Sequence, residues 1–421
     1  FSSLRAEGQT EVVRMKSIKW IENRLPKTED RELGIMALGE VRAARAFHES
    51  FPQYRVTPLA ELKELARFYG LKKLCVKDES FRFGLNAFKV LGGSFAMARY
   101  ISKLTGRPIE ELTYEVLTSP ELKAQTGDLT FLSATDGNHG RGVAWAAKKL
   151  GQKAVIMMPR GSQKSRFENI QKEGALTTIE EFNYDDCVRK AAAAAVKTPG
   201  GVVIQDTAWK GYEEIPAWIM QGYGTMALES DEQFCAGTAE APTHVFIQAG
   251  VGSLAGAVVG YFTNRYPKNP PKFIVAESDQ ADCLYRSAQA GDGSVRIVEG
   301  DMRTIMAGLA CGEPNTSSWQ ILKDKASVFV SLPDWAAANG MRVLGAPLSG
   351  DPRVISGESG AAPAGLLYSL MTEEALCPLR EKLELGAESR VLLFSTEGDT
   401  DPENYRHIVW DGAWSHCDSE L

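Results

Sequence analysis

Short apolar runs alternate with longer segments of helical periodicity along most of the chain. The apolar runs lie at residues 74–79, 129–135, 153–159, 201–206, 243–250, 272–278 and 389–397. Between them, segments such as 184–197 repeat apolar residues every three or four positions, as amphipathic helices do. Strands that alternate with helices in this way form βαβ units, in which helices cover both faces of a parallel sheet. We therefore predict an α/β protein with twisted, mainly parallel sheets.

Local signals predict where two helices begin and where a long loop lies. Thr57-Pro58 resembles an N-cap followed by a first-turn proline, so we predict an amphipathic helix over 59–70. Asn86 predicts the cap of a second helix that runs to about residue 104. The segment 281–320 is rich in Gly, Asp and Pro, and we predict loops there that cover a site.

Composition indicates a globular protein and excludes several kinds of partner. The 421 residues are 44% apolar and 24% charged, which is ordinary for a chain that buries a large core. The net charge of −7 argues against nucleic acid and anionic membranes as partners. No uncharged apolar stretch reaches the length of about 18 residues that a membrane span needs.

The cysteines and the first residues indicate a cytoplasmic protein without a metal site. The seven cysteines are scattered, with no CxxC and no metal-like spacing, as in proteins of a reducing cytosol. Whether Cys283 and Cys311 pair stays open at this point. Residues 1–20 are interrupted by charges and lack the apolar core of a signal peptide.

One strand end carries a glycine-rich turn. Open α/β sheets bind ligands beyond the carboxyl ends of their strands. There the run at 243–249 leads into GVGSLAG, residues 250–256, and then into a helix. Glycines let the backbone approach an anion, and the helix N-terminus offers unpaired N–H groups, so the turn predicts a phosphate cradle. A tight βα turn is an equal alternative. A dinucleotide site is disfavoured because the third glycine of its GxGxxG motif is missing, and Gly256 lies one residue too late to serve as it. Glu277 could still be the acidic residue of such a site, so that alternative stays open.

Polar residues also follow other strands, and one lysine sits among apolar neighbours. Asp136 and Asn138 follow the run at 129–135, and Asp206 ends the run at 201–206. Turn chemistry or acid/base chemistry would each explain them. Lys89 lies in GLNAFKVLG, where an unpaired buried ammonium would cost several kcal/mol unless it snorkels to water. A desolvated amine near a phosphate cradle, without a metal motif, suggests a Schiff base with pyridoxal phosphate (PLP).

Seven segments then resemble a known enzyme family. In order they read KDESFRFGLNAFKVLGG, SATDGNHGRGVAWAA, QDTAWKGYEEIPAWIMQGY, QAGVGSLAG, MAGLACGEP, SGESGA and STEGDTDPENY, from about residue 75 to 410. Together they resemble the diaminopropionate ammonia-lyase family, among the tryptophan-synthase-β-like (fold type II) PLP enzymes. NAFK, TDGNHGRG and QDTAW separate this family from serine and threonine dehydratases, which typically show a serine-rich lysine motif and SGNH.

The resemblance implies an architecture and an activity. It implies two three-layer α/β domains with PLP in the cleft between them. The larger domain would combine 1–94 and 206–421, and the smaller would be an insertion at 95–205. Residues 1–40 fall largely outside the resemblance and would form an arm or part of an interface. The family implies a homodimer that converts both enantiomers of a small amino acid, 2,3-diaminopropionate, into pyruvate and ammonia.

The resemblance also implies roles for individual residues. Lys89 matches the lysine that forms the Schiff base and later moves protons, and Asn138 matches the asparagine that binds the cofactor's 3′-oxygen. Asp136 matches the base for the D-isomer, and Asp206 matches the residue that handles the proton of the L-isomer. The phosphate-binding loop matches Gly250, Val251, Gly252, Ser253 and Leu254. The hydroxyl that faces the pyridine nitrogen matches Ser395, or Thr396 if the register differs by one residue.

Two alternatives remain from the sequence. A serine/threonine dehydratase or another fold type II enzyme for β-elimination or β-replacement would share the fold, but Asp136 and Asp206 count against it. A ligand-binding α/β protein without chemistry would also fit the pattern of strands, but Lys89 counts against it.

Overall fold

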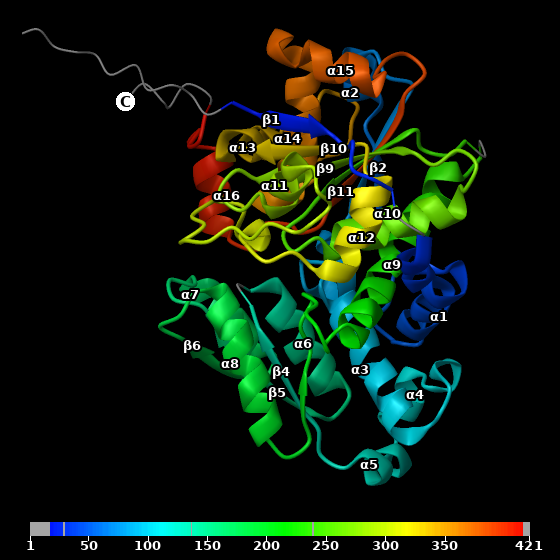
Figure 1. The fold of residues 1–421 in the computed structure, drawn as a ribbon, viewed down its shortest axis with the longest axis vertical. Helices are drawn as coiled ribbons and strands as arrows, with labels where there is room; N and C mark the ends of the chain where they lie inside the picture. Colours follow the sequence, from blue (N-terminus) through cyan, green and yellow to red (C-terminus); the bar gives the residue numbers. More distant parts are fainter. Residues whose placement is uncertain (1–16, 28–29, 136, 238–239, 416–421) are drawn as a thin grey trace, which may run out of the picture.

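Two separate sheets organise the chain, and helices cover both (Figure 1). The computed structural model describes residues 17–27, 30–135, 137–237 and 240–415. The larger sheet has seven strands in the order β1 (Lys19–Glu22), β10 (Val328–Leu332), β9 (Lys272–Ser278), β8 (His244–Gln248), β11 (Arg390–Ser395), β3 (Lys73–Asp78) and β2 (Leu59–Glu61). The smaller sheet has four strands in the order β6 (Leu176–Ile179), β5 (Lys153–Met158), β4 (Thr130–Ala134) and β7 (Gly201–Val203).

Strand direction confirms the predicted fold class. Neighbours from β10 through β3 in the larger sheet are parallel, and only the edge strands β1 and β2 run antiparallel. All neighbours in the smaller sheet are parallel. The four strands of the smaller sheet fall within 95–205, the range assigned to the inserted domain. The exact domain boundaries stay a prediction.

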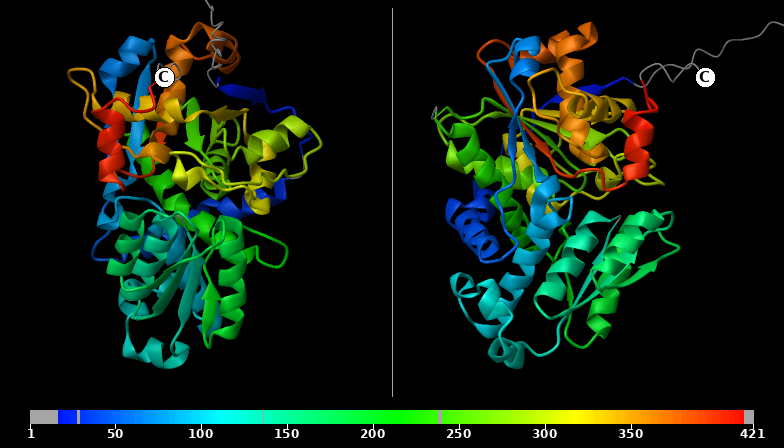
Figure 2. Two further views of the ribbon diagram at one scale, coloured as in Figure 1. Left: turned by 90° about the vertical axis from the view of Figure 1, so that its left-hand side faces the viewer. Right: turned by 180° about the vertical axis from the view of Figure 1, so that it is seen from behind.

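The helices pack on both faces of each sheet because successive strand residues point to opposite sides. In β8, Val245 and Ile247 join one core cluster and Phe246 joins another. Figure 2 shows the two α/β units stacked along the long axis. The helices are α1 (Leu38–Glu49), α2 (Lys63–Tyr69), α3 (Val90–Thr105), α4 (Tyr114–Leu117), α5 (Pro120–Thr126), α6 (Asn138–Lys149), α7 (Lys164–Lys172), α8 (Tyr184–Lys197), α9 (Glu214–Cys235), α10 (Ser253–Arg265), α11 (Cys283–Ala290), α12 (Thr316–Lys325), α13 (Asp334–Gly345), α14 (Glu358–Thr372), α15 (Cys377–Leu383) and α16 (Pro402–Val409).

Two local predictions were wrong in detail. Residues 59–61 form β2, which pairs with β3, so the helix expected from residue 59 begins only at Lys63. Asn86 does not cap a helix; its φ is +59° and α3 begins at Val90. The loops predicted within 281–320 are confirmed, and they lie between α11 and α12. No helix among the described residues has both the length and the apolar character that crossing a membrane requires.

A buried cluster of charges lies where β3 and the turn after it pack on α9. Glu229 accepts hydrogen bonds from Lys77 Nζ at 2.7 Å and from both terminal nitrogens of Arg82 at 2.8 and 2.9 Å. Arg82 also binds Glu79, and all four side chains are at most 1% exposed. Burial by itself would raise the pKa of Glu229, but Arg82 and Lys77 hold that pKa below its usual range. The two cations and two carboxylates therefore neutralise one another inside the core.

We expect Glu229→Gln to lower the free energy of unfolding by about 3–5 kcal/mol, because it leaves buried cations without their shared partner. Urea denaturation at neutral pH measures the change. Glu232→Gln is the matched control on α9, since Glu232 is 56% exposed and pairs with Arg45 at 2.5 Å; it should cost less than about 1 kcal/mol. Because the pKa of Glu229 is lowered on folding, its contribution is present above the ordinary glutamate pKa. It should fade as the pH falls below about 4. Equal losses in the two variants would contradict this account.

Candidate active site

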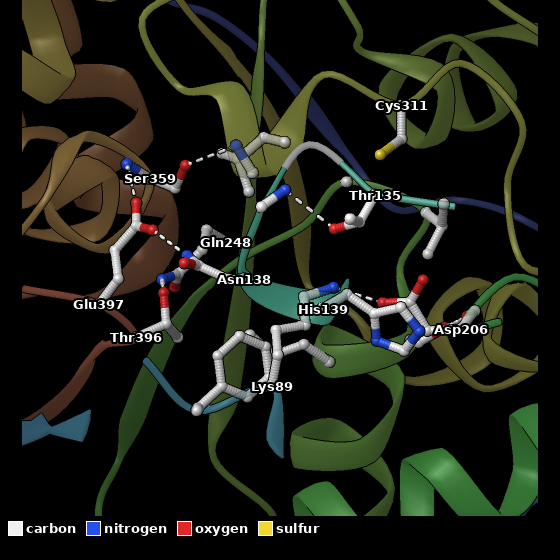
Figure 3. A pocket seen from close by; sticks show the side chains of 18 of the residues that line it. Lys89, Thr135, Asn138, His139, Asp206, Gln248, Cys311, Ser359, Thr396 and Glu397 are labelled. Atoms are coloured by element: carbon white, nitrogen blue, oxygen red, sulfur yellow. Dashed lines mark hydrogen bonds and ion pairs between the residues drawn. The ribbon is translucent and has the colours of Figure 1, made fainter. Parts of the chain in front are cut away.

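One cavity lies where the carboxyl ends of β4, β8 and β11 approach the start of α3 (Figure 3). It has a volume of about 760 Å³, part of which is open to solvent. Most of the residues singled out from the sequence line it, namely Lys89, Asn138, Asp206, Gly250, Val251, Gly252, Ser253, Leu254 and Thr396. Two sheets thus bring together segments that are far apart in the sequence, as open α/β sheets do at ligand sites.

Lys89 neither snorkels nor sits unpaired. It is the N-cap residue of α3, and its Nζ forms an ion pair with Asp206. The Lys89 side chain is 20% exposed and that of Asp206 is 2% exposed. Burial alone would raise the pKa of Asp206, but the Lys89 ammonium outweighs it and holds that pKa at about 2. The cavity therefore contains an amine and an ionised carboxylate in direct contact.

His139 contributes a neutral ring next to this pair. Its Nε2 lies 2.8 Å from the Ile204 carbonyl oxygen, and a carbonyl only accepts, so Nε2 carries the proton. Burial lowers the pKa of His139 from its ordinary value. Its Nδ1 is buried without a hydrogen-bond partner among the described residues. The backbone bond fixes the ring beside the cavity, which supports a packing role.

The glycine-rich turn has the geometry of an anion cradle. Gly252 has a φ of +97° and precedes α10, which has no side-chain cap. The N–H groups of the first turn of α10 therefore have no intrahelical partner and face an anion favourably. A Cβ at Gly252 would lie 2.9 Å from Ser318 Oγ, so a larger residue would disturb the turn.

The side chain of Ser253 links this loop to Asp206. Ser253 Oγ donates to the Asp206 backbone oxygen. Asn315 Nδ2 donates to the same oxygen at 3.2 Å and to Ser253 Oγ at 2.7 Å. The loop therefore offers an anion its backbone amides, because the hydroxyl is already engaged. Asn315, whose contact depends on the tertiary fold, was not identified from the sequence.

The hydroxyls of Ser395 and Thr396, which are adjacent at the end of β11, have different surroundings. Thr396 lines the cavity, and its Oγ1 accepts a hydrogen bond from Gln248 Nε2 at 2.7 Å. Its own proton is thus free to point elsewhere. Ser395 Oγ instead donates to Ser356 Oγ at 2.8 Å, away from the residues that line the cavity. The geometry therefore favours Thr396 over Ser395 as a cavity donor.

Asn138 is the first residue of α6, and Glu397 holds its amide. Asn138 Nδ2 donates to Glu397 Oε2 at 2.5 Å. Glu397 lines the cavity too, yet nothing in the sequence singled it out beyond its place in STEGDTD. Asp136, the predicted base for the D-isomer, lies outside the described residues.

The residues fit PLP better than a metal ion. The first turn of α10 suits a phosphate, Thr396 suits a ring nitrogen, and Lys89 suits an aldehyde. The buried Gln248 Oε1 has no partner among the described side chains, which marks this wall as incomplete without a ligand. In the part of the chain that the structure describes, no three His, Cys, Asp or Glu side chains could hold a metal together. Cys283 and Cys311 are both thiols and do not form a disulfide.

Comparisons with known proteins agree with this chemistry. Residues 51–396 match the family described as pyridoxal-phosphate dependent enzyme. A diaminopropionate ammonia-lyase of Salmonella typhimurium strain LT2 is 54% identical over 368 residues, which are 87% of this chain and 91% of that protein. One from Escherichia coli strain K12 is 49% identical over 379 residues, 90% of this chain and 93% of that protein.

A solved structure extends the likeness to three dimensions. It is the Escherichia coli diaminopropionate ammonia-lyase in complex with an aminoacrylate-PLP azomethine reaction intermediate, with a TM-score of 0.85 and 46% identity. The match covers 95% of this chain and 98% of that one. The resemblance seen in the seven sequence segments is confirmed: the chain belongs to the pyridoxal-phosphate dependent enzymes and, among them, to the diaminopropionate ammonia-lyase family.

Proposed function

We propose that this chain catalyses the PLP-dependent α,β-elimination of 2,3-diaminopropionate to pyruvate and two ammonia. The observation that carries this proposal is the contact between Lys89 and the buried Asp206 beside an anion cradle. Relatives at 49% and 54% identity that are named for this reaction support the choice of substrate. A serine/threonine dehydratase is the second candidate, and Asp206 at the lysine argues against it.

Four parts of the cavity would hold the cofactor. The backbone amides of 250–254 would bind its phosphate, and Lys89 would bind its aldehyde. Asn138 would face the ring oxygen, and Thr396 rather than Ser395 would donate to the ring nitrogen. When bound, PLP supplies an electron sink for the negative charge that develops at the α-carbon. A hydroxyl donor leaves the ring nitrogen neutral, which suits elimination because the leaving amine drains that charge promptly.

Asp206 changes its basicity with the charge of Lys89. While the ammonium is adjacent, the pKa of Asp206 is held at about 2 and the carboxylate is a weak base. When Lys89 loses its charge or moves away, burial dominates and the pKa of Asp206 rises. The carboxylate then becomes able to take a proton from the α-carbon of the L-isomer. Loss of the β-amine also requires a proton, and Asp206 carries one once it has taken it from the α-carbon.

We also infer a homodimer in the cytoplasm. The family resemblance supports the homodimer, which a light-scattering mass of twice the 46.0 kDa chain would test. The six cysteines that the structure describes are all thiols, as is common in a reducing compartment. A fusion to a fluorescent protein would test the location.

Product stoichiometry tests the reaction itself. Separate D- and L-2,3-diaminopropionate should each yield two ammonia per pyruvate, and L-serine and L-threonine should yield little. Lys89→Ala should abolish turnover of both isomers, because it removes the amine that binds the aldehyde. Faster release from serine or threonine would identify a dehydratase instead.

We expect Asp206→Asn to lower kcat/KM for the L-isomer by about 10²–10⁴-fold, the usual contribution of a general base. The D-isomer should lose much less. Pyruvate release from each isomer gives both values. Asp136→Asn is the matched variant and should show the reverse preference. Equal losses for the two isomers in either variant would rule out separate bases.

The two hydroxyls at the end of β11 can be told apart by cofactor affinity. Thr396→Val removes one hydrogen bond of ordinary strength, so we expect the Kd of PLP to rise about 3- to 10-fold. Ser395→Ala should change it less than about 2-fold, because that hydroxyl binds Ser356. Titration of the apoenzymes, followed by absorbance, compares them. A larger effect at Ser395 would restore the register first expected from the sequence.

A further inference from the structure

Glu397 is a buried cavity residue to which neither the sequence motifs nor the proposed reaction assigns a role. The residue is 3% exposed, and its side chain lies between Asn138 and Ser359 (Figure 3). One carboxylate oxygen accepts from Asn138 Nδ2 at 2.5 Å, and the other accepts from the Ser359 backbone N–H at 3.1 Å. Both oxygens are thus engaged by N–H donors, which matches an ionised carboxylate because that group only accepts.

The backbone around Glu397 is fixed on both sides. Phe88 N donates to the Thr396 oxygen at 3.1 Å, and Gly398 N donates to the Asn86 oxygen at 3.0 Å. The segment that carries Glu397 is therefore tied to the segment that carries Lys89. A Cβ at Gly357 would lie 2.9 Å from Glu397 Cγ, so the side chain has little room to turn. The Glu397 carboxylate therefore has a fixed position in the cavity wall.

A second buried carboxyl group lies behind it. Glu358 is 3% exposed and accepts from Asn404 Nδ2 at 2.5 Å. Burial and the neighbouring Glu397 charge raise the pKa of Glu358 to about 7. Glu358 lies beside Glu397 but has a hydrogen-bond partner of its own, Asn404, and does not contact Asn138.

The charge of Glu397 decides how the Asn138 amide is oriented. A primary amide has one acceptor oxygen and two N–H donors, and its two ends have nearly the same shape. Toward a carboxylate it can present only the NH₂ end. One N–H of Asn138 is used on Glu397, and the second N–H is then held in a fixed direction.

We propose that Glu397 is a positioning residue that holds the Asn138 amide so that its second N–H donates to the ring oxygen of the cofactor. This proposal rests on the proposed function, because only a chain that binds PLP uses the donor. Glu397 acts through Asn138 and need not touch the substrate.

Glu397→Gln separates this role from simple packing. Glutamine has almost the same shape, but it offers one acceptor and one donor end, so it cannot accept from Asn138 and Ser359 together. The Asn138 amide is then released or reversed. We expect the Kd of PLP for the apoenzyme to rise about 10- to 100-fold. We also expect the visible absorbance band of the bound cofactor to change its pH midpoint.

Glu358→Gln is the matched control, since it neutralises the adjacent buried carboxyl without removing a partner of Asn138. Its PLP affinity should stay within about 3-fold of the wild type. Circular dichroism and thermal unfolding of each apoenzyme report whether the fold is retained. Wild-type affinity and an unchanged pH midpoint in Glu397→Gln, or equal losses in the two variants, would overturn the proposal.

A double variant keeps the test informative if a single variant is unstable. Asn138→Asp places two carboxylates in contact and should lower Tm. Asn138→Asp combined with Glu397→Gln restores one hydrogen bond in the opposite direction and should recover Tm, but it leaves no N–H for the cofactor and should not recover PLP affinity. Recovery of both would overturn the proposal. Because PLP binding is measured without substrate, a wild type that binds PLP but does not consume diaminopropionate would refute only the proposed function.

Discussion

The ion pair between Lys89 and Asp206 is the contact on which the cavity depends. A largely buried ammonium is costly unless an opposite charge compensates it. Asp206, which follows β7 of the smaller sheet, supplies the opposite charge. Lys89 is the N-cap of α3, the helix that follows β3 of the larger sheet. Ser253 and Asn315 hold the backbone of Asp206 in turn. Asp206 therefore aligns Lys89 through its carboxylate, and the glycine-rich turn and the loop before α12 through its backbone oxygen.

A second set of paired, buried charges supports the segment of the chain that leads to Lys89. The cluster of Lys77, Arg82, Glu79 and Glu229 fixes β3 and the turn after it against α9. That turn leads within a few residues to Lys89. Buried charges are costly unless their geometry is maintained, so a cluster of this kind tolerates little movement. The chain thus places a buried network of paired charges just before Lys89.

The sequence predicted most of the parallel strands, including the edge strand β7, but missed four strands of the described structure. A parallel strand covered on both faces is a continuous apolar run, so β3, β5, β8, β9 and β11 were all recognisable. Among the strands not identified, β1 and β2 are short antiparallel edge strands, and β6 has only one buried residue. The fourth, β10, is a fully buried central strand whose short apolar run was not selected from the sequence. The helix expected at Thr57-Pro58 was displaced because residues 59–61 pair with β3, a tertiary contact that overrides a local cap signal.

The sequence likewise located some residues of the site and missed others. Strand ends and the family resemblance located Lys89, Asn138 and Asp206, because those signals are local. The choice between Ser395 and Thr396 needed the structure, since adjacent strand residues face opposite sides. Asn315 and Glu397 were missed because their importance lies in partners far away along the chain.

The long sequence separation between contacting residues of the cavity has a consequence for folding. Asp206 lies 117 residues from Lys89, and Glu397 lies 259 residues from Asn138. Contacts of such long range are costly in chain entropy and form late, after local helices and hairpins. Neither half of the chain contains a complete cavity. Acquisition of the cofactor therefore marks the end of folding, and a truncated or stalled chain would hold its secondary structure without the means to capture PLP.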